Sequence, residues 1–192
     1  MTSKIKVNIL ADGGDNSIIT SDGAGSFTAS SSLASSVQSV GGIQNTPAFS
    51  ARMSGIQSIT HEVYTKVDFD TEIFDTDGAY DPSTNQRFTV PSGKDGKYFF
   101  YANLIADSQS AANLQNCQIT FYKNGSEFKK NTWNFNSNDI FYAGMQISSV
   151  MDLSAADYIE VYVRISDASG SPRIDGSGST LSEFTGYKII GV

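Results

Sequence analysis

The residue types that most often catalyse reactions are scarce in this chain. His61 is the only histidine and Cys117 is the only cysteine. No serine stands in a Gly-x-Ser-x-Gly motif, and His61 is not part of a His-Glu-x-x-His motif. Distance along the sequence leaves a Ser/His/Asp or Cys/His arrangement open, but no motif supports one. We therefore predict that the protein is not an enzyme, that His61 is an ordinary loop residue, and that Cys117 is a small buried hydrophobe with no internal disulfide partner.

Motifs for cation binding are incomplete. The segment Asp75-Thr76-Asp77-Gly78 is similar to the start of a calcium-binding loop, but the acidic ligand that ends such a loop is missing. We predict a hairpin turn there, and a second turn at Asp12-Gly13-Gly14-Asp15. On these motifs alone the sequence predicts no cofactor.

Two positions could contact carbohydrate. Asn124-Gly125-Ser126 satisfies the pattern for an N-linked glycan, and its Asn-Gly pair is also the strongest hairpin signal in the chain. Trp133 precedes a loop rich in Asn and Ser and could stack on a sugar ring, although we favour a place in the core or in an interface. Neither position identifies a ligand.

Length, charge and composition limit the classes of protein to consider. The 192 residues carry a net charge of −7 without a cluster of Lys or Arg, so we do not expect a nucleic acid partner. No stretch approaches the roughly 18 to 20 apolar residues of a membrane span, and the short apolar patch at residues 7–11 does not predict a secretory signal. Abundant Gly, Ser and Thr, with 11% aromatic residues, favour an all-β protein with many turns.

Residues 1–45 are expected to form a separate N-terminal arm. Segments 5–9, 17–20 and 26–28 could be short strands, and the last two could pair around a turn at Asp22-Gly23. The arm has too few apolar residues for a core of its own, so it must be disordered or dock on a partner.

The Ser-rich segment 29–40 leaves two interpretations open. Leu33, Val37 and Val40 have the spacing of one helical stripe. A helix this short would need three copies on a common axis to be stable, whereas a linker needs no such support. We favour the linker.

From Thr46 to Val192 the pattern is strand after strand. The clearest is residues 96–105, where a glycine opens an aromatic and aliphatic run that we interpret as a strand buried on both faces. The other predicted strands are residues 48–53, 64–69, 87–91, 118–123, 127–133, 140–151, 158–165 and 184–192. Eight to ten short strands at this spacing predict a sandwich or jelly roll.

Several motifs of this region, in their order and spacing, resemble those of a known family. They are Phe49-Ser50-Ala51, Phe69, Gly78-Ala79-Tyr80-Asp81, Phe88-Thr89-Val90-Pro91, Gly96-Lys97-Tyr98-Phe99-Phe100, Tyr122-Lys123-Asn124-Gly125 and Ser182-Glu183-Phe184-Thr185-Gly186-Tyr187. Residues 47–192 thereby resemble the globular-head domain of complement component C1q, a family related to tumour necrosis factor.

The resemblance implies a ten-stranded antiparallel jelly-roll sandwich that assembles as a homotrimer. Calcium occurs in some relatives, so Asp167, Asp175 and Glu183 are candidate cation ligands near the trimer axis. The predicted structural core is Phe49, Phe69, Tyr80, Phe88, Gly96, Tyr98, Phe99, Phe184 and Gly186.

Two functions remain open on the sequence. The arm resembles, in composition, the start of small bacteriophage fibre and capsid-decoration proteins, which suggests a trimeric knob attached to a virion through residues 1–45. The alternative is an extracellular, complement-like module that binds a receptor or a glycan.

The polar loops are expected at the end of the jelly roll opposite to the arm. The first and last strands of this fold are neighbours, so Thr46 and Val192 should share one end. The loops from Asp107 to Asn116, from Asn134 to Asp139 and from Asp167 to Thr180 should then lie together at the other end, as candidate recognition loops.

Overall fold

We describe the protein from a computed structural model. It describes residues 9–11, 13, 17–21, 24, 27–29, 45–109, 111–135, 137, 139–177 and 182–189. The chain divides into two compact units, Met1–Gln44 and Asn45–Val192, and each is described here by itself. Within the described residues, no helix has the length and apolarity needed to cross a membrane.

The first unit contains a small antiparallel sheet in the order β1-β2-β3. Its strands are β1 (Ile9–Ala11), β2 (Ser17–Ser21) and β3 (Phe27–Ala29). β2 and β3 pair as the sequence predicted, with Thr20 opposite Thr28. Of the strand expected at residues 5–9, only Ile9 is described, and it begins β1. The helix or linker of segment 29–40 lies outside the described residues beyond Ala29.

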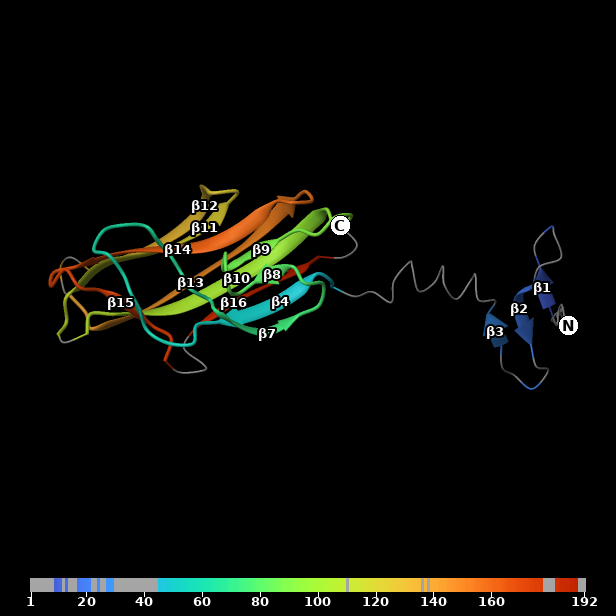
Figure 1. Cartoon of the computed structure of the whole chain (residues 1–192), viewed down its shortest axis with the longest axis horizontal. Helices are drawn as coiled ribbons and strands as arrows, with labels where there is room; N and C mark the ends of the chain where they lie inside the picture. Colours follow the sequence, from blue (N-terminus) through green and yellow to red (C-terminus); the bar gives the residue numbers. More distant parts are fainter. Residues whose placement is uncertain are drawn as a thin grey trace, which may run out of the picture. The chain divides into compact units, whose positions relative to one another are not determined.

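The second unit is an antiparallel sandwich of two sheets, which confirms the all-β jelly-roll fold (Figure 1). The seven-stranded sheet contains β4 (Ala48–Arg52), β5 (Gln57–Ser58), β7 (Thr71–Asp75), β10 (Gly96–Asp107), β13 (Tyr142–Leu153), β15 (Arg173–Asp175) and β16 (Glu183–Lys188). The six-stranded sheet contains β6 (Thr65–Lys66), β8 (Tyr80–Asp81), β9 (Arg87–Thr89), β11 (Leu114–Lys123), β12 (Ser126–Asn134) and β14 (Tyr158–Asp167).

Strand order within each sheet brings distant segments together. The seven-stranded sheet runs β5-β15-β10-β16-β4-β7, and β13 pairs with the other edge of β10. The six-stranded sheet runs β12-β11-β14-β9-β8, and β6 pairs with β14. The predicted strands 64–69 and 87–91 contain the short strands β6 and β9. The sequence did not predict β5, β8 or β15, because segments of two or three residues are too short to show a period, nor β7, because it is mostly exposed on both faces.

The long strand β10 corrects one prediction from the sequence. Its burial alternates: Tyr98, Phe100 and Leu104 are buried, whereas Phe99 and Tyr101 are half-buried on the opposite face. The six-stranded sheet covers only one face of β10, so this strand is not buried on both faces within one chain. Phe99 therefore lies outside the core in which the sequence placed it.

Aromatic rings fill the space between the sheets. The Phe49 ring stacks on Tyr80 and Phe88 at centroid distances of 4.8 and 5.1 Å and meets Phe184 edge-on at 4.9 Å. Offset and edge-on ring pairs of this kind add to the free energy gained by burying their area. Six of the predicted core residues are buried here: Phe49, Phe69, Tyr80, Phe88, Tyr98 and Phe184.

Two glycines are required by close approach or backbone conformation. A Cβ atom at Gly186 would lie 2.5 Å from the ring of Phe100, so no side chain fits there without displacing the core. Gly96 has a φ of 142°, which other residues rarely adopt, and a Cβ there would lie 3.0 Å from Cε of Lys188. Gly186 is buried, whereas Gly96 is only half-buried at the start of β10.

Candidate functional site

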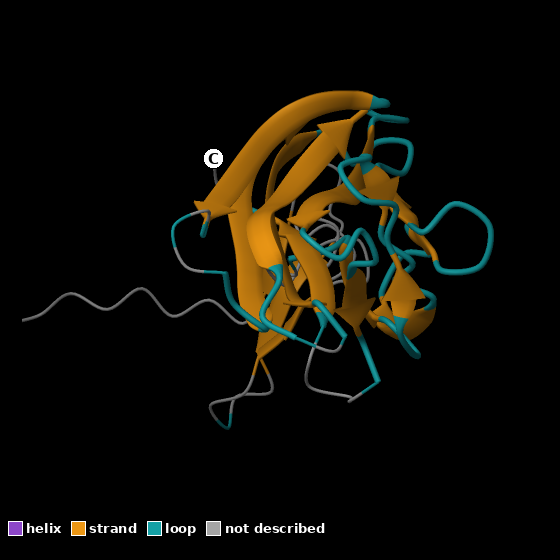
Figure 2. Cartoon of the chain, turned by 90° about the vertical axis from the view of Figure 1, so that its left-hand side faces the viewer, coloured by secondary structure: helices purple, strands orange, loops and turns teal. Residues whose placement is uncertain are grey.

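Three loops meet at one end of the sandwich, which we call the loop end (Figures 1 and 2). Their described residues are 108–109 and 111–113, then 135, 137 and 139–141, and finally 168–172. Leu114 forms a bridge with Ile140, and the backbone N–H of Ala168 donates to the carbonyl of Asn113 at 2.9 Å. The ends of the domain lie at the other end, where the N–H of Lys188 donates to the carbonyl of Pro47 at 3.0 Å. The described parts of the three loops thus lie together, opposite Pro47 and Lys188, as the sequence predicted, whereas Val192 lies outside the described residues.

Several residues named in the predicted loops belong instead to strands. β10 extends to Asp107, and Asn116 lies inside β11. Asn134 ends β12 and is exposed, whereas Asp139 is half-buried. Thr180 lies outside the described residues.

Asp107 is a buried structural residue and not an exposed recognition residue. Its carboxylate receives a charged hydrogen bond from Nε of Arg173 at 2.5 Å and another from the backbone N–H of Gln109 at 2.7 Å. The pair joins β10 to β15, because Asp107 and Arg173 are in register across the two strands. Sequence reasoning missed this pair because its partners lie far apart in the chain.

Asp167 is also buried and ends β14. Its Oδ1 accepts the backbone N–H of Ser169 at 2.7 Å, and its own N–H donates to Nδ1 of His61 at 3.2 Å. His61 therefore holds a backbone amide rather than a nucleophile. Burial, and then the negative charge of Asp167, raise the pKa of the Cys117 thiol to about 12, so this thiol is not a reactive thiolate at neutral pH.

The structure does not gather the candidate cation ligands into one cluster. Asp175 accepts hydrogen bonds from the hydroxyl and N–H of Ser177, which lower its pKa. Glu183 accepts the hydroxyl of Ser50 at 3.3 Å. Among the described residues, no group of three or more His, Cys, Asp or Glu is placed to hold a metal ion.

The outer face of the seven-stranded sheet exposes apolar side chains, and we call it the assembly face. Phe99 lies in register with Tyr187 on one side and Val150 on the other, and the rings of Phe99 and Tyr187 are 5.5 Å apart. Val150, Phe74 and Tyr187 are 53%, 47% and 38% exposed. Sequence reasoning placed Phe99 in the core instead of on this face, and it missed Phe74, which lies on the unpredicted strand β7.

A polar hollow interrupts this apolar face. Ser50, Arg52, Ile73, Asn103 and Glu183 are among the residues that line it. The Oδ1 atom of Asn103 is buried and has no hydrogen-bond partner among the described residues. The assembly face is therefore apolar at Ile73 and Phe74 of β7 and along the row of Phe99, Val150 and Tyr187. It is polar around Asn103 and at Gln146 and Ser148 of β13.

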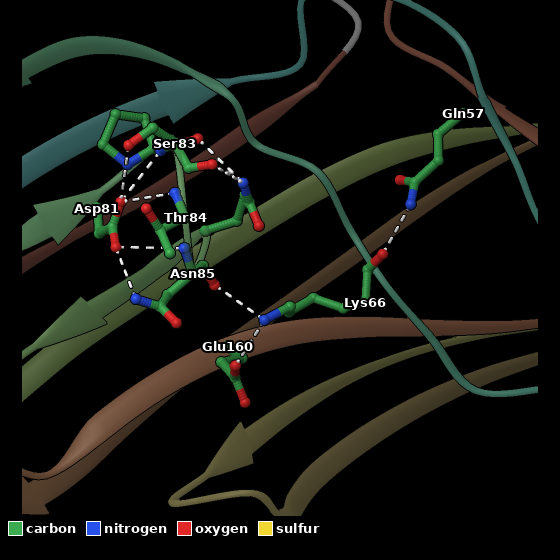
Figure 3. Close-up of polar contacts among 9 residues, drawn as sticks. Gln57, Lys66, Asp81, Ser83, Thr84, Asn85 and Glu160 are labelled. Carbon is green, nitrogen blue, oxygen red and sulfur yellow. Dashed lines mark hydrogen bonds and ion pairs between the residues drawn. The ribbon is translucent and has the colours of Figure 1, made fainter.

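The outer face of the six-stranded sheet carries ion pairs and hydrogen bonds between its own side chains, although the buried Oγ1 of Thr120 has no hydrogen-bond partner among the described residues. Figure 3 shows Nζ of Lys66 donating to Oε1 of Glu160 at 3.0 Å and to the carbonyl of Asn85 at 2.9 Å. Glu160 is buried, so its charge needs this partner. The amide of Gln57 in turn donates to the carbonyl of Lys66 at 2.8 Å.

A carboxylate also closes the turn beside this pair (Figure 3). Asp81 accepts the backbone N–H groups of Ser83, Thr84 and Asn85, at 3.1, 2.9 and 3.2 Å. Hydrogen bonds from the backbone of Thr84 first, and then from the side-chain amide of Asn85 and from Ser83, lower the pKa of Asp81 to about 2. The turn thus carries a negative charge whose partners are all local.

Two further sequence candidates have structural roles. Trp133 is half-buried on β12 and packs against the core, which leaves less of its ring for a sugar. Asn124 and Gly125 form the turn between β11 and β12, both with positive φ.

Comparison with known proteins agrees with this architecture. A protein-family model described as the C1q domain matches residues 48–189. The globular domain of zebrafish complement 1qA protein aligns with a TM-score of 0.49 and 14% identity, over 74% of this chain and 97% of that one. Murine APRIL aligns with a TM-score of 0.53 and 11% identity, over 74% of this chain and 98% of that one. A search of curated proteins finds no match.

Proposed function

The chain belongs to the C1q domain family, and from that premise we propose that it is a non-enzymatic recognition module that works as a homotrimer. The observation that carries the proposal is the assembly face. Large apolar side chains on an open sheet face are normally covered by a partner. Val150, Phe74 and Tyr187 lie on such a face and are each more than one third exposed.

The loop end is the surface that such a trimer offers for recognition. Its three loops are carried by long strands whose ends are fixed by backbone hydrogen bonds and by the Asp107–Arg173 ion pair. Loops held on a rigid scaffold are common binding sites, because their side chains are positioned before the ligand arrives. The ligand we propose is a receptor or a glycan on another surface.

The test of assembly uses two matched phenylalanines. Phe74 is 47% exposed on β7 at the edge of the assembly face, and Phe128 is 48% exposed on β12 of the other sheet. Light scattering should give three times the 20.6 kDa monomer mass for the wild type and for Phe128→Glu. Phe74→Glu should dissociate, because it places a charge in an apolar interface.

Two results would contradict the proposal. One is a folded wild-type monomer at micromolar concentration. The other is a Phe74→Glu variant that remains as fully trimeric as Phe128→Glu.

For the biological setting we propose attachment to a virion, as a capsid decoration or a tail-fibre tip, assembled in the host cytoplasm. Residues 1–45 would be the anchor: the first unit is compact by itself, and its β1 exposes Ile9 and Leu10 at 52% and 54%. The alternative setting is extracellular, as a complement-like module. Neither depends on a nucleic acid or a cofactor.

Removal of the arm tests attachment to the particle separately from formation of the trimer. A protein beginning at Thr46 should remain a folded trimer but no longer join the particle. Incorporation of the truncated protein at full occupancy would overturn the anchor assignment, while leaving the trimer proposal intact.

A further inference from the structure

Asn124 makes contacts that its position in a turn does not require. Asn124 and Gly125 are exposed and form a two-residue hairpin with φ values of 52° and 77°. Asn-Gly is favoured in such turns because both residues tolerate positive φ. That preference concerns the backbone and leaves the side-chain amide free.

The side-chain amide of Asn124 is held at both of its polar atoms. Its Nδ2 donates to Oδ1 of Asp157 at 2.7 Å, and its Oδ1 accepts the backbone N–H of Tyr158 at 2.9 Å. Oδ2 of Asp157 in turn accepts Nζ of Lys123 and the N–H of Ser154, both at 2.9 Å. The start of β14 therefore clamps the amide of the β11–β12 turn.

An Asn-Gly pair can deamidate, and hydrogen bonds that hold its side-chain amide would slow this reaction. The backbone nitrogen of Gly125 attacks Cγ of Asn124, and the bond from Cγ to Nδ2 breaks. Nδ2 leaves as ammonia with the proton that the Gly125 nitrogen loses, and a cyclic imide remains. Water then opens the ring to aspartate or isoaspartate, without any oxidation or reduction. Gly125 favours the attack because it has no Cβ beside the attacking nitrogen.

We infer that Asn124 is a deamidation site that the fold protects, with Asp157 as the positioning residue. The attack requires the amide to turn toward the nitrogen of Gly125, which breaks the bonds to Asp157 and Tyr158. Hydrogen bonds from Asn124, and then from Lys123, lower the pKa of Asp157 to about 2, so Asp157 remains a charged acceptor at neutral pH.

Deamidation of Asn124 would break the hydrogen bond from its side chain to Asp157. Aspartate or isoaspartate at position 124 has no Nδ2–H to donate, and it places a second carboxylate next to Asp157. Two carboxylates in one site repel each other. Isoaspartate also adds a backbone carbon to a two-residue turn, whose length sets the register of β11 and β12.

The experiment follows deamidation in the full-length protein during incubation at mildly alkaline pH, with peptide mass mapping of position 124. Asp157→Ala should deamidate about tenfold faster than the wild type, since it frees one end of the amide. Lys123→Met is the matched control: it removes the cation from Asp157 but leaves the amide contacts, and its rate should stay near that of the wild type. Equal rates in folded Asp157→Ala and wild type would overturn the inference.

Unfolding provides a second measurement that does not depend on a variant. The wild type in urea should deamidate at Asn124 at least about tenfold faster than the native protein, because both amide contacts are lost. Equal rates in the native and the unfolded protein would show that the fold gives no protection. Asn124→Asp, which mimics one product, should melt below the wild type, and an unchanged melting temperature would contradict the predicted opening of the clamp.

Discussion

The two outer faces of the sandwich cover the same aromatic core but present opposite surfaces. On the six-stranded sheet, Lys66 pairs with the buried Glu160, and the Tyr64 hydroxyl donates to Gln118 at 2.8 Å. On the seven-stranded sheet, Val150 and Phe74 stand about half exposed with no cover from this chain. The six-stranded sheet links many of its polar side chains by ion pairs and hydrogen bonds and exposes Phe128 on its edge strand β12, whereas the seven-stranded sheet exposes a row of apolar side chains.

This difference shows why burial in one chain is an incomplete guide to which residues matter. Phe99 is half-buried in the monomer, and its neighbours in register are Tyr187 and Val150. A single exposed apolar residue needs no explanation. Here, however, three neighbouring apolar side chains form a row across three strands. The core begins one residue away on either side of this row, at Tyr98 and Phe100.

The largest expected effect comes from the core that both faces share. Phe184→Ala should lower the free energy of unfolding by about 3 to 5 kcal/mol, because Phe184 is fully buried and contacts the ring of Phe49. Chemical denaturation measures the loss, with Phe128→Ala as the control that should cost far less, because Phe128 is 48% exposed. An unchanged midpoint for Phe184→Ala would contradict the assignment of β16 to the core.

A smaller loss of stability is expected at the ion pair on the six-stranded sheet. Lys66→Met should cost about 1 to 3 kcal/mol, because it leaves the carboxylate of Glu160 buried without its cation. The side chain of Lys66 is 28% exposed, so solvent replaces part of the lost interaction. The trimer mass measured by light scattering should not change. Dissociation of this variant would show that the six-stranded face also takes part in assembly.

Much of the fold could be predicted from the sequence because its signals are local. The Asn124-Gly125 turn, the glycine that begins β10 and the alternation in β11 each lie within a few residues. The order of motifs then indicated the family. β7 gave no such signal, since an edge strand exposed on both faces has no apolar period.

The roles of the polar residues were harder to predict, because polarity alone does not distinguish a loop from a buried pair. Asp107 and Asp167 look like surface loop residues, yet both are buried at the ends of long strands. Asp107 depends on Arg173, which lies 66 residues away. Nothing near Asp107 in the sequence indicates that partner, so only the register of β10 and β15 identifies it.

The smallest expected effect is a pH-dependent change in stability at the turn of Asp81. Its pKa is lowered to about 2 from an ordinary value of 3.8, so the folded state binds the proton less readily than the unfolded state. The stabilisation is therefore complete above pH 3.8 and is lost as the pH falls toward 2. Asp81→Asn should melt below the wild type at neutral pH, with the difference shrinking through that window. A constant difference would show that the charge of Asp81 contributes nothing, and that the turn depends on neutral hydrogen bonds alone.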